Sequence, residues 1–79
     1  MLRTNLIKAR GDRTQTELAE LLGVKQQTVS HWELGRATPP IDKMLQIERL
    51  LKVPKEVLFY DIFNSNGEYL APINTGTEA

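Results

Sequence analysis

The chain has 79 residues, of which 41% are hydrophobic and 25% charged, as in an ordinary globular protein. It contains no cysteine, which excludes disulfide bonds, thiolate catalysis and cysteine-based zinc sites. Ten basic and ten acidic side chains cancel, so an attraction to polyanions has to rest on where the charges lie. A chain this short forms at most one domain and buries only about 60% of its unfolded surface, so it needs a compact fold or a partner.

The sequence contains no recognisable targeting or membrane segment. Residues 1–13 carry charges every few positions and lack an apolar stretch long enough for a signal peptide. No uncharged apolar run approaches the roughly 20 residues of a membrane helix. We therefore expect a soluble, cytoplasmic protein. The single histidine, His31, argues against an imidazole metal site, and we expect no metal, no cofactor and no small-molecule ligand.

Hydrophobic residues recur at intervals of three and four from Leu6 to Phe63, and no part of that span alternates for long with a period of two. This spacing predicts an all-α fold. We expect one compact domain over residues 1–63, followed by a C-terminal tail over 64–79 that is flexible or holds one short extended segment. Glycines and prolines divide the domain into five short helices, at about 2–10, 14–23, 26–34, 41–51 and 54–63.

Local signals support these helix ends. Thr14 and Glu17 are spaced as a capping box, in which each side chain accepts a hydrogen bond from the backbone amide of the other. Gly23 stands at a very tight turn, where a residue without Cβ strain is needed. The fourth helix has a broad apolar face, made of Ile41, Met44, Leu45, Ile47 and Leu51.

The pattern that points to function lies in residues 15–33. A small residue, Ala19, stands where two closely crossing helices would touch, and Gly23 stands in the sharp turn between them. On the second helix, Val29 and Trp32 lie three residues apart and would pack back on the first. The spacing is that of a helix-turn-helix unit.

The outward side of the second helix, 26–34, has an unusual composition. It is neutral and polar, and its side chains both donate and accept hydrogen bonds, as the edges of bases require. A plain surface helix, the alternative, would carry lysine and glutamate there. The side chains that point away from the core are Gln27, Ser30, His31 and Leu34, with Gln26 and Thr28 at the flanks.

The segment TQTELAELLGV, followed by QQTVSHWELGR and a proline, resembles the Cro/repressor-type helix-turn-helix family, also called the XRE family. The resemblance covers about residues 2–63 and implies a compact five-helix bundle of the phage-repressor DNA-binding type. It implies that helix 26–34 enters the major groove of DNA. It also implies that Gln15, at the head of the preceding helix, contacts a phosphate and supports Gln26.

The resemblance further implies that Arg10 of the first helix pairs with Glu33 of the W-E-x-G motif. Three residues depart from the family pattern. Lys25 stands where the family usually has a serine or threonine N-cap, and it could serve a phosphate instead. Leu34 replaces a common asparagine and is either unpacked or in contact with a thymine methyl group. Glu48 stands where an alanine is usual, and the sequence gives no account of it.

The charge distribution partly resolves the neutral total. Residues 1–36 hold six basic and four acidic groups and residues 37–79 hold four and six, so the halves carry +2 and −2. The N-terminal half is therefore the better DNA-binding face. The side chains expected to contact bases are Gln26, Gln27, Ser30 and His31. Those expected to contact the DNA backbone are Arg13, Thr14, Gln15, Thr16, Lys25, Thr28, Arg36 and Lys43.

The fifth helix predicts a dimer. Six of the seven residues in segment 57–63 are apolar or aromatic, so apolar surface surrounds nearly the whole helix, and one core can cover only one side of it. Tail residues Tyr69, Leu70 and Ile73 could cover the other side within the same chain, which is the alternative. The residues expected at the interface are Val57, Phe59, Tyr60, Ile62 and Phe63.

These patterns predict a sequence-specific regulator of transcription that binds double-stranded DNA. The simplest form is a repressor that binds a palindromic operator as a homodimer. The alternative is a protein-interaction module, such as an antitoxin or antirepressor, built on the same fold. We expect no enzymatic activity, because no nucleophile with a base, no pair of carboxylates in a cleft and no glycine-rich phosphate loop can be assembled from the sequence.

Overall fold

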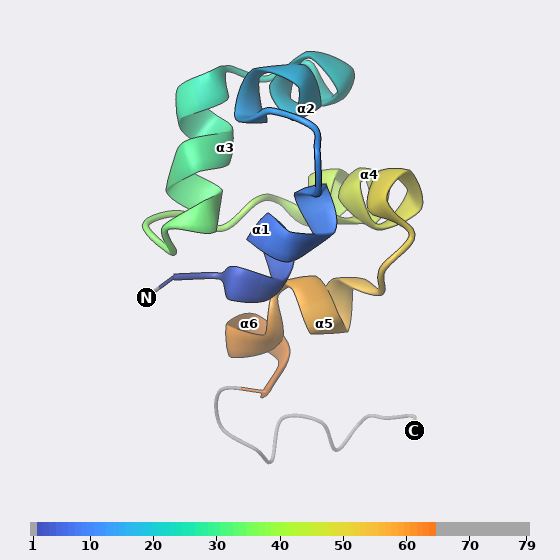
Figure 1. Ribbon diagram of the computed structural model, residues 1–79. Coiled ribbons are helices and arrows are strands. Elements are labelled where there is room, and N and C mark those ends of the chain that lie inside the picture. Colours follow the sequence, from blue (N-terminus) through green and yellow to red (C-terminus); the bar gives the residue numbers. More distant parts are fainter. Residues whose placement is uncertain (1, 65–79) are drawn as a thin grey trace.

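The computed structural model describes residues 2–64, which are all-helical and contain no strand. The predicted fold class is confirmed. Asn64 of the expected tail closes the last helix, and the rest of the tail, with its short extended segment, lies outside the described residues. The helices are α1 Thr4–Arg10, α2 Gln15–Leu22, α3 Gln26–Glu33, α4 Ile41–Leu51, α5 Lys55–Leu58 and α6 Tyr60–Asn64 (Figure 1).

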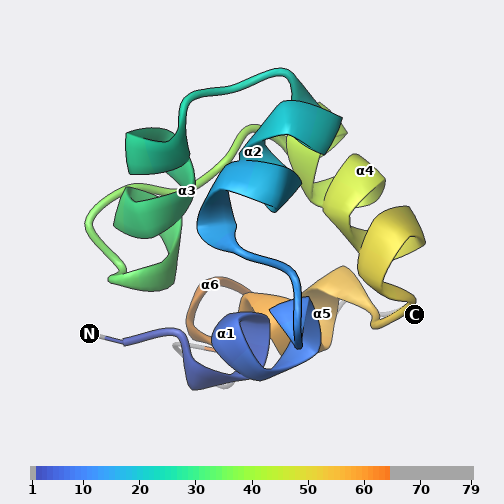
Figure 2. The same ribbon diagram turned by 45° about the horizontal axis from the view of Figure 1, so that its top comes forward.

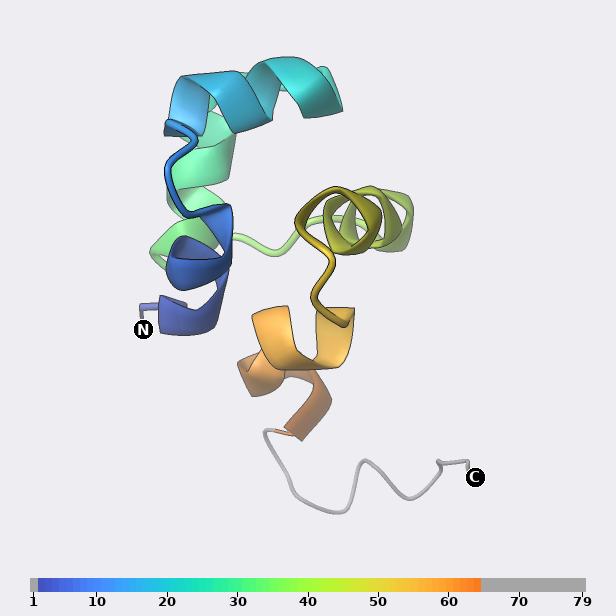
Figure 3. The same cartoon turned by 45° about the vertical axis from the view of Figure 1, so that its right-hand side comes forward.

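The helices surround a single core. In Figure 1, α2 and α3 form one end of the molecule, α5 and α6 form the other, and α1 lies between them in contact with α3 and α5. Figure 2 shows α1 and α5 side by side below the pair formed by α2 and α3. In Figure 3, where α4 is seen nearly along its axis, α2 runs across one end of α3. The buried apolar side chains are Leu6, Leu18, Ala19, Leu22, Val29, Trp32, Met44, Ile47, Leu58 and Phe59.

The local signals at α2 are present as predicted. The Glu17 amide donates to Thr14 Oγ1 at 3.0 Å and the Thr14 amide donates to Glu17 Oε1 at 2.9 Å, which completes the capping box. Gly23 takes the left-handed conformation, with φ 71° and ψ 32°, and ends α2. Lys25 precedes α3 without any side-chain cap. The tight turn therefore depends on the glycine at its start.

The fifth predicted helix is wrong in one respect, because it is divided in two. The backbone leaves the helical region at Phe59, with φ −118° and ψ 50°, so that α5 ends and α6 begins. Leu58 and Phe59 are both buried by this turn, whereas Val57 and Tyr60 on either side stay exposed. A run of apolar residues shows no such division in sequence, because the division comes from packing against the rest of the chain.

The apolar face predicted for the fourth helix is also partly wrong. Met44 and Ile47 are buried and Leu51 is half-buried, but Ile41 and Leu45 are exposed. Successive helical residues differ by about 100° in direction, so the side of α4 that faces the core cannot include all five. Ile41 and Leu45 lie at its edge.

Glu48, which the sequence left unexplained, has a clear role. Its Oε2 atom accepts a hydrogen bond from the backbone amide of Lys55 at 3.0 Å. Lys55 is the first residue of α5, whose N-cap, Pro54, has no side-chain donor or acceptor. Glu48 therefore satisfies an amide at the start of α5 that would otherwise lack a partner, and the carboxylate suits the positive end of that helix.

Candidate nucleic-acid interface

Helix α3 has two different sides. Val29 and Trp32 are buried in the core, as predicted. Gln27 and His31 are exposed on the opposite side, and Ser30 between them is half-buried. Thr28 is half-buried, and Gln26 and Leu34 are exposed at the two ends of the helix. The side chains expected to contact bases thus form one solvent-facing polar surface.

A chain of hydrogen bonds connects the interior to the start of α3. Arg10 donates to Glu33 through Nε at 2.6 Å and Nη2 at 3.2 Å, so the predicted ion pair is present. Gln15 Nε2 donates to Glu33 Oε1 at 2.8 Å. Gln26 Nε2 donates to Gln15 Oε1 at 2.6 Å. We call Arg10, Glu33, Gln15 and Gln26 the relay, because in this order each is hydrogen-bonded to the next, from the interior to the surface.

The inner part of the relay is shielded from water. The Glu33 side chain is 3% exposed and that of Arg10 18%. A carboxylate in such a place is costly unless its oxygens are paired. Arg10 and Gln15 together supply three N–H donors to Glu33. The relay therefore joins α1, the start of α2 and both ends of α3, which positions the polar surface of α3 relative to the N-terminus of α2.

Most side chains expected to contact the DNA backbone are exposed near this surface. Arg13, Lys25 and Arg36 are exposed cations. Thr14, Gln15 and Thr16 stand at the N-terminus of α2, where backbone amides that lack helical partners and the helix dipole favour an anion. Thr14 also serves as the cap of that helix.

Lys43 does not fit the expected set. Its Nζ atom donates to the backbone oxygen of Leu22 at 2.7 Å. Leu22 is the last residue of α2, so the ammonium satisfies a carbonyl at the negative end of that helix. The phosphate contact predicted for Lys43 is therefore not supported, because its ammonium stabilises the junction between α4 and α2. The sequence showed only a basic residue and could not distinguish these two roles.

The profile of the family described as Helix-turn-helix matches residues 6–58, which include α2, the turn and α3. The chain belongs to the helix-turn-helix family, of the Cro/repressor type. Repressor protein C of Escherichia phage P2 is 38% identical over 47 residues, which are 60% of this chain and 48% of the phage protein. The chain thus spans about half the length of this curated relative. No solved structure matches it significantly.

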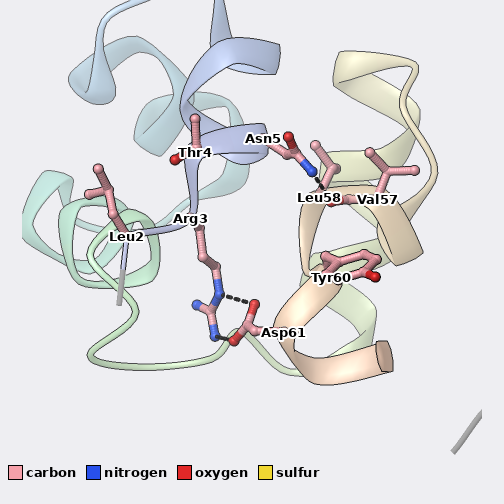
Figure 4. Close-up of a pocket in the computed structure, with 8 residues that line it drawn as sticks. All are labelled: Leu2, Arg3, Thr4, Asn5, Val57, Leu58, Tyr60 and Asp61. Atoms are coloured by element: carbon pink, nitrogen blue, oxygen red, sulfur yellow. Dashed lines mark hydrogen bonds and ion pairs between the residues drawn. The ribbon is translucent and has the colours of Figure 1, made fainter. Parts of the chain in front are cut away.

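This helix-turn-helix chain contains a second arginine site that sequence reasoning missed. Arg3, which directly precedes α1, has a side chain only 3% exposed, and its Nε and Nη2 atoms each donate to Asp61 at 3.0 Å (Figure 4). Nη1 donates to the backbone oxygens of Trp32 at 2.8 Å and Ala37 at 2.7 Å, and Nη2 donates to Thr38 Oγ1 at 3.1 Å. We call this group the Arg3 cluster. No local pattern identifies it, because Arg3 and Asp61 are 58 positions apart.

The Arg3 cluster changes the charge argument made from the sequence. The hydrogen bonds from Arg3 lower the pKa of the Asp61 carboxyl below its ordinary value. Arg3 and Arg10 are both paired with buried or half-buried carboxylates. Neither cation is therefore free to attract a polyanion, which leaves exposed cations such as Arg13, Lys25 and Arg36 as the candidates for that role.

A shallow pocket of about 300 Å³ lies between the start of α1 and the pair α5 and α6, beside the Arg3 cluster (Figure 4). Its apolar lining includes Leu2, Val57 and Tyr60, which are 54%, 42% and 61% exposed. Within residues 2–64, no helix is long and apolar enough to cross a membrane, and no three acidic or histidine side chains gather as metal ligands would.

Proposed function

We propose that this chain is a sequence-specific DNA-binding repressor of transcription whose α3 enters the major groove. The observation that carries the proposal is the relay, which fixes an exposed glutamine at the start of a neutral polar helix face. Such positioning is unnecessary for a helix that only faces water. The name of the phage P2 relative, repressor protein C, supports the same class.

Four side chains of α3 would read the bases. A glutamine amide can contact adenine at N6 and N7 together, so Gln26 and Gln27 predict adenines in the half-site. His31 lies about one helical turn beyond Gln27 and would contact a base further along the groove. Ser30 lies on the same face and can donate or accept.

The remaining contacts would hold the DNA backbone. Arg13, Lys25 and Arg36 supply charge, which attracts any duplex regardless of sequence. Uncharged donors would complete this set, namely Thr14, Gln15, Thr16 and Thr28. Because Lys25 replaces a capping residue, its ammonium is available for a phosphate near the start of α3.

We further propose that the protein acts as a homodimer on a palindromic operator. Phe59 is removed from the predicted interface because it is fully buried in the core of its own chain. Val57 and Tyr60 remain exposed, and with Leu2 they form an apolar surface around the pocket of Figure 4. Ile62 and Phe63 are half-buried against the core, so part of each side chain stays accessible to a partner.

Sedimentation of the full chain at micromolar concentration tests the dimer. A dimer that becomes a monomer on Tyr60→Glu substitution is expected, and a strict monomer of the unmodified chain would contradict it. In a twofold dimer the recognition helices should lie about 34 Å apart, on half-sites 10–10.5 base pairs apart. Inserting about five base pairs between the half-sites should then abolish tight binding, and unchanged affinity would mean that monomers bind independently.

The experiment that tests the function is selection of bound duplexes from a random pool, followed by affinity measurements at several salt concentrations. We expect a recovered half-site containing adenine and an affinity for it that falls steeply as salt increases. Absence of retention on random duplex DNA or heparin at low salt would contradict the proposal. That outcome would favour the alternative, a protein-interaction module.

A further inference from the structure

The relay contains two side-chain amides in series, Gln26 and Gln15. They lead from the surface inward to the buried carboxylate of Glu33. An amide has a donor end and an acceptor end, whereas an ionised carboxylate only accepts. The direction of the hydrogen bonds along the relay is therefore determined at its buried end. We propose that Glu33, which lies behind the DNA-facing surface, determines which base Gln26 recognises. This inference rests on the function proposed above and deepens it.

The argument begins at the carboxylate. Glu33 Oε1 accepts from Gln15 at 2.8 Å, so Gln15 must turn its NH₂ group inward and its oxygen outward. The outward oxygen then accepts from the NH₂ group of Gln26 at 2.6 Å. Each amide can take only one of its two orientations, because the opposite orientation would place a carbonyl oxygen against a carboxylate or against another carbonyl oxygen.

The consequence for Gln26 is a fixed hydrogen-bonding pattern toward the groove. One of its two N–H bonds is used on Gln15, which leaves one donor and one acceptor. Adenine presents an N6 donor and an N7 acceptor in the major groove, and this pair matches what Gln26 offers. Guanine presents two acceptors, O6 and N7, and would need two donors. Gln26 held by the relay therefore selects adenine and disfavours guanine.

Replacing the carboxylate by an amide should reverse this pattern. Arg10 contacts both oxygens of Glu33, Oε2 through Nε at 2.6 Å and Oε1 through Nη2 at 3.2 Å, and it can only donate. In Glu33→Gln, the new amide oxygen keeps the shorter contact, with Nε, and the longer contact with Nη2 is lost. The new NH₂ group then faces Gln15 and donates to it. Gln15 turns over and donates to Gln26, and Gln26 turns over in response. Both N–H bonds of Gln26 then point to the DNA, as guanine requires.

The test measures the ratio of two affinities for each protein: the selected operator and the same duplex with guanine replacing the adenine opposite Gln26. A ratio within one protein sample cancels any loss of folded protein, which separates positioning from stability. The unmodified chain should prefer adenine by roughly 5- to 150-fold, as one bidentate contact predicts. Glu33→Gln should reduce this ratio by about tenfold or more, toward guanine.

Gln15→Leu provides the matched control, because it separates Glu33 from Gln26. Alone it should bring the adenine-to-guanine ratio closer to one, since the Gln26 amide is then free to turn over. In the Gln15→Leu background, Glu33→Gln should have no further effect on the ratio. If Glu33→Gln fails to fold, Gln15→Leu alone decides, because an unchanged ratio in that variant overturns the inference.

The outcomes separate this inference from the function on which it rests. If Gln26→Ala does not change the preference at this base, the base contact proposed for Gln26 is wrong. If Gln26→Ala removes the preference but Glu33→Gln leaves the ratio unchanged, α3 reads the base and Glu33 does not determine which one. Only a shift toward guanine that requires Gln15 supports the relay as the determinant of specificity.

Discussion

Two arginines of the first ten residues, Arg3 and Arg10, contact the end of α3, and they have different structural roles. Arg3 donates to Asp61, to Thr38 and to the backbone oxygens of Trp32 and Ala37, so its hydrogen bonds join separate segments of the fold. Arg10 pairs with Glu33. Glu33 also accepts a hydrogen bond from Gln15, and Gln15 in turn accepts one from the exposed amide of Gln26. The same guanidinium–carboxylate chemistry thus holds the chain together in one place and orients a surface residue in the other.

The largest expected effect comes from breaking the Arg3 cluster. Arg3→Met removes one partner of a largely buried ion pair and leaves the backbone oxygen of Ala37 without its donor, while that of Trp32 keeps only the Gly35 amide at 3.2 Å. We expect the free energy of unfolding to fall by about 3–5 kcal/mol. Urea denaturation followed by circular dichroism measures this.

The matched control for Arg3→Met is Lys8→Met, which removes an exposed cation from α1. Its effect should stay within about 0.5 kcal/mol. A loss below about 1 kcal/mol for Arg3→Met would show that the cluster adds little to stability. The comparison between the two arginine sites would then fail.

A smaller effect is expected from pH, through Asp61. Hydrogen bonds from Arg3 lower the pKa of this carboxyl in the folded state. The stability that it contributes is therefore fully present above the pKa of the unfolded chain, about 3.9, and is lost as the pH falls through the lower folded value. Asp61→Asn lacks this dependence, so its deficit in unfolding free energy should be largest at neutral pH and should shrink below about pH 4. A constant deficit from pH 7 to pH 3 in urea denaturation would contradict the assignment.

A still smaller effect is expected at the start of α2, beside the relay. Thr14→Ala removes the side-chain half of the capping box and should lower the free energy of unfolding by about 1 kcal/mol, whereas Thr14→Ser should retain most of it. Because Gln15 keeps its own bonds, the base preference should not change. Thermal or urea unfolding measures the first effect. A changed base preference in a folded Thr14→Ala protein would show that the cap, too, helps to orient Gln26.

The comparison also shows what the sequence could predict. The capping box at Thr14, the turn at Gly23 and the bounds of helix 41–51 depend on nearby residues, and all three were predicted. The Arg10 pair and the support of Gln26 by Gln15 followed from the family resemblance. These features have recognisable spacings.

The features that escaped prediction depend on contacts between distant parts of the chain. In the sequence, Arg3 is only one of six basic residues in positions 1–36, and its partner Asp61 is 58 positions away. The sequence predicts Lys43 as a phosphate contact, whereas its ammonium donates to the carbonyl at the end of α2. The division between α5 and α6 at Phe59 comes from packing in the core, which a run of apolar residues does not reveal. The residues proposed to contact DNA remain predictions.

The central claim is that the exposed face of α3 chooses the DNA sequence, and Gln27 tests it most directly, because it is exposed and lies outside the relay. The measurement is the affinity of Gln27→Ala for the selected operator and for a random duplex, with Lys25→Ala as the comparison. We predict that Gln27→Ala weakens operator binding by roughly 5- to 150-fold and leaves random-duplex binding nearly unchanged. Lys25→Ala should weaken both and reduce the salt dependence by up to about one unit of slope. An equal loss of both affinities in Gln27→Ala would contradict the assignment of α3 as the recognition helix.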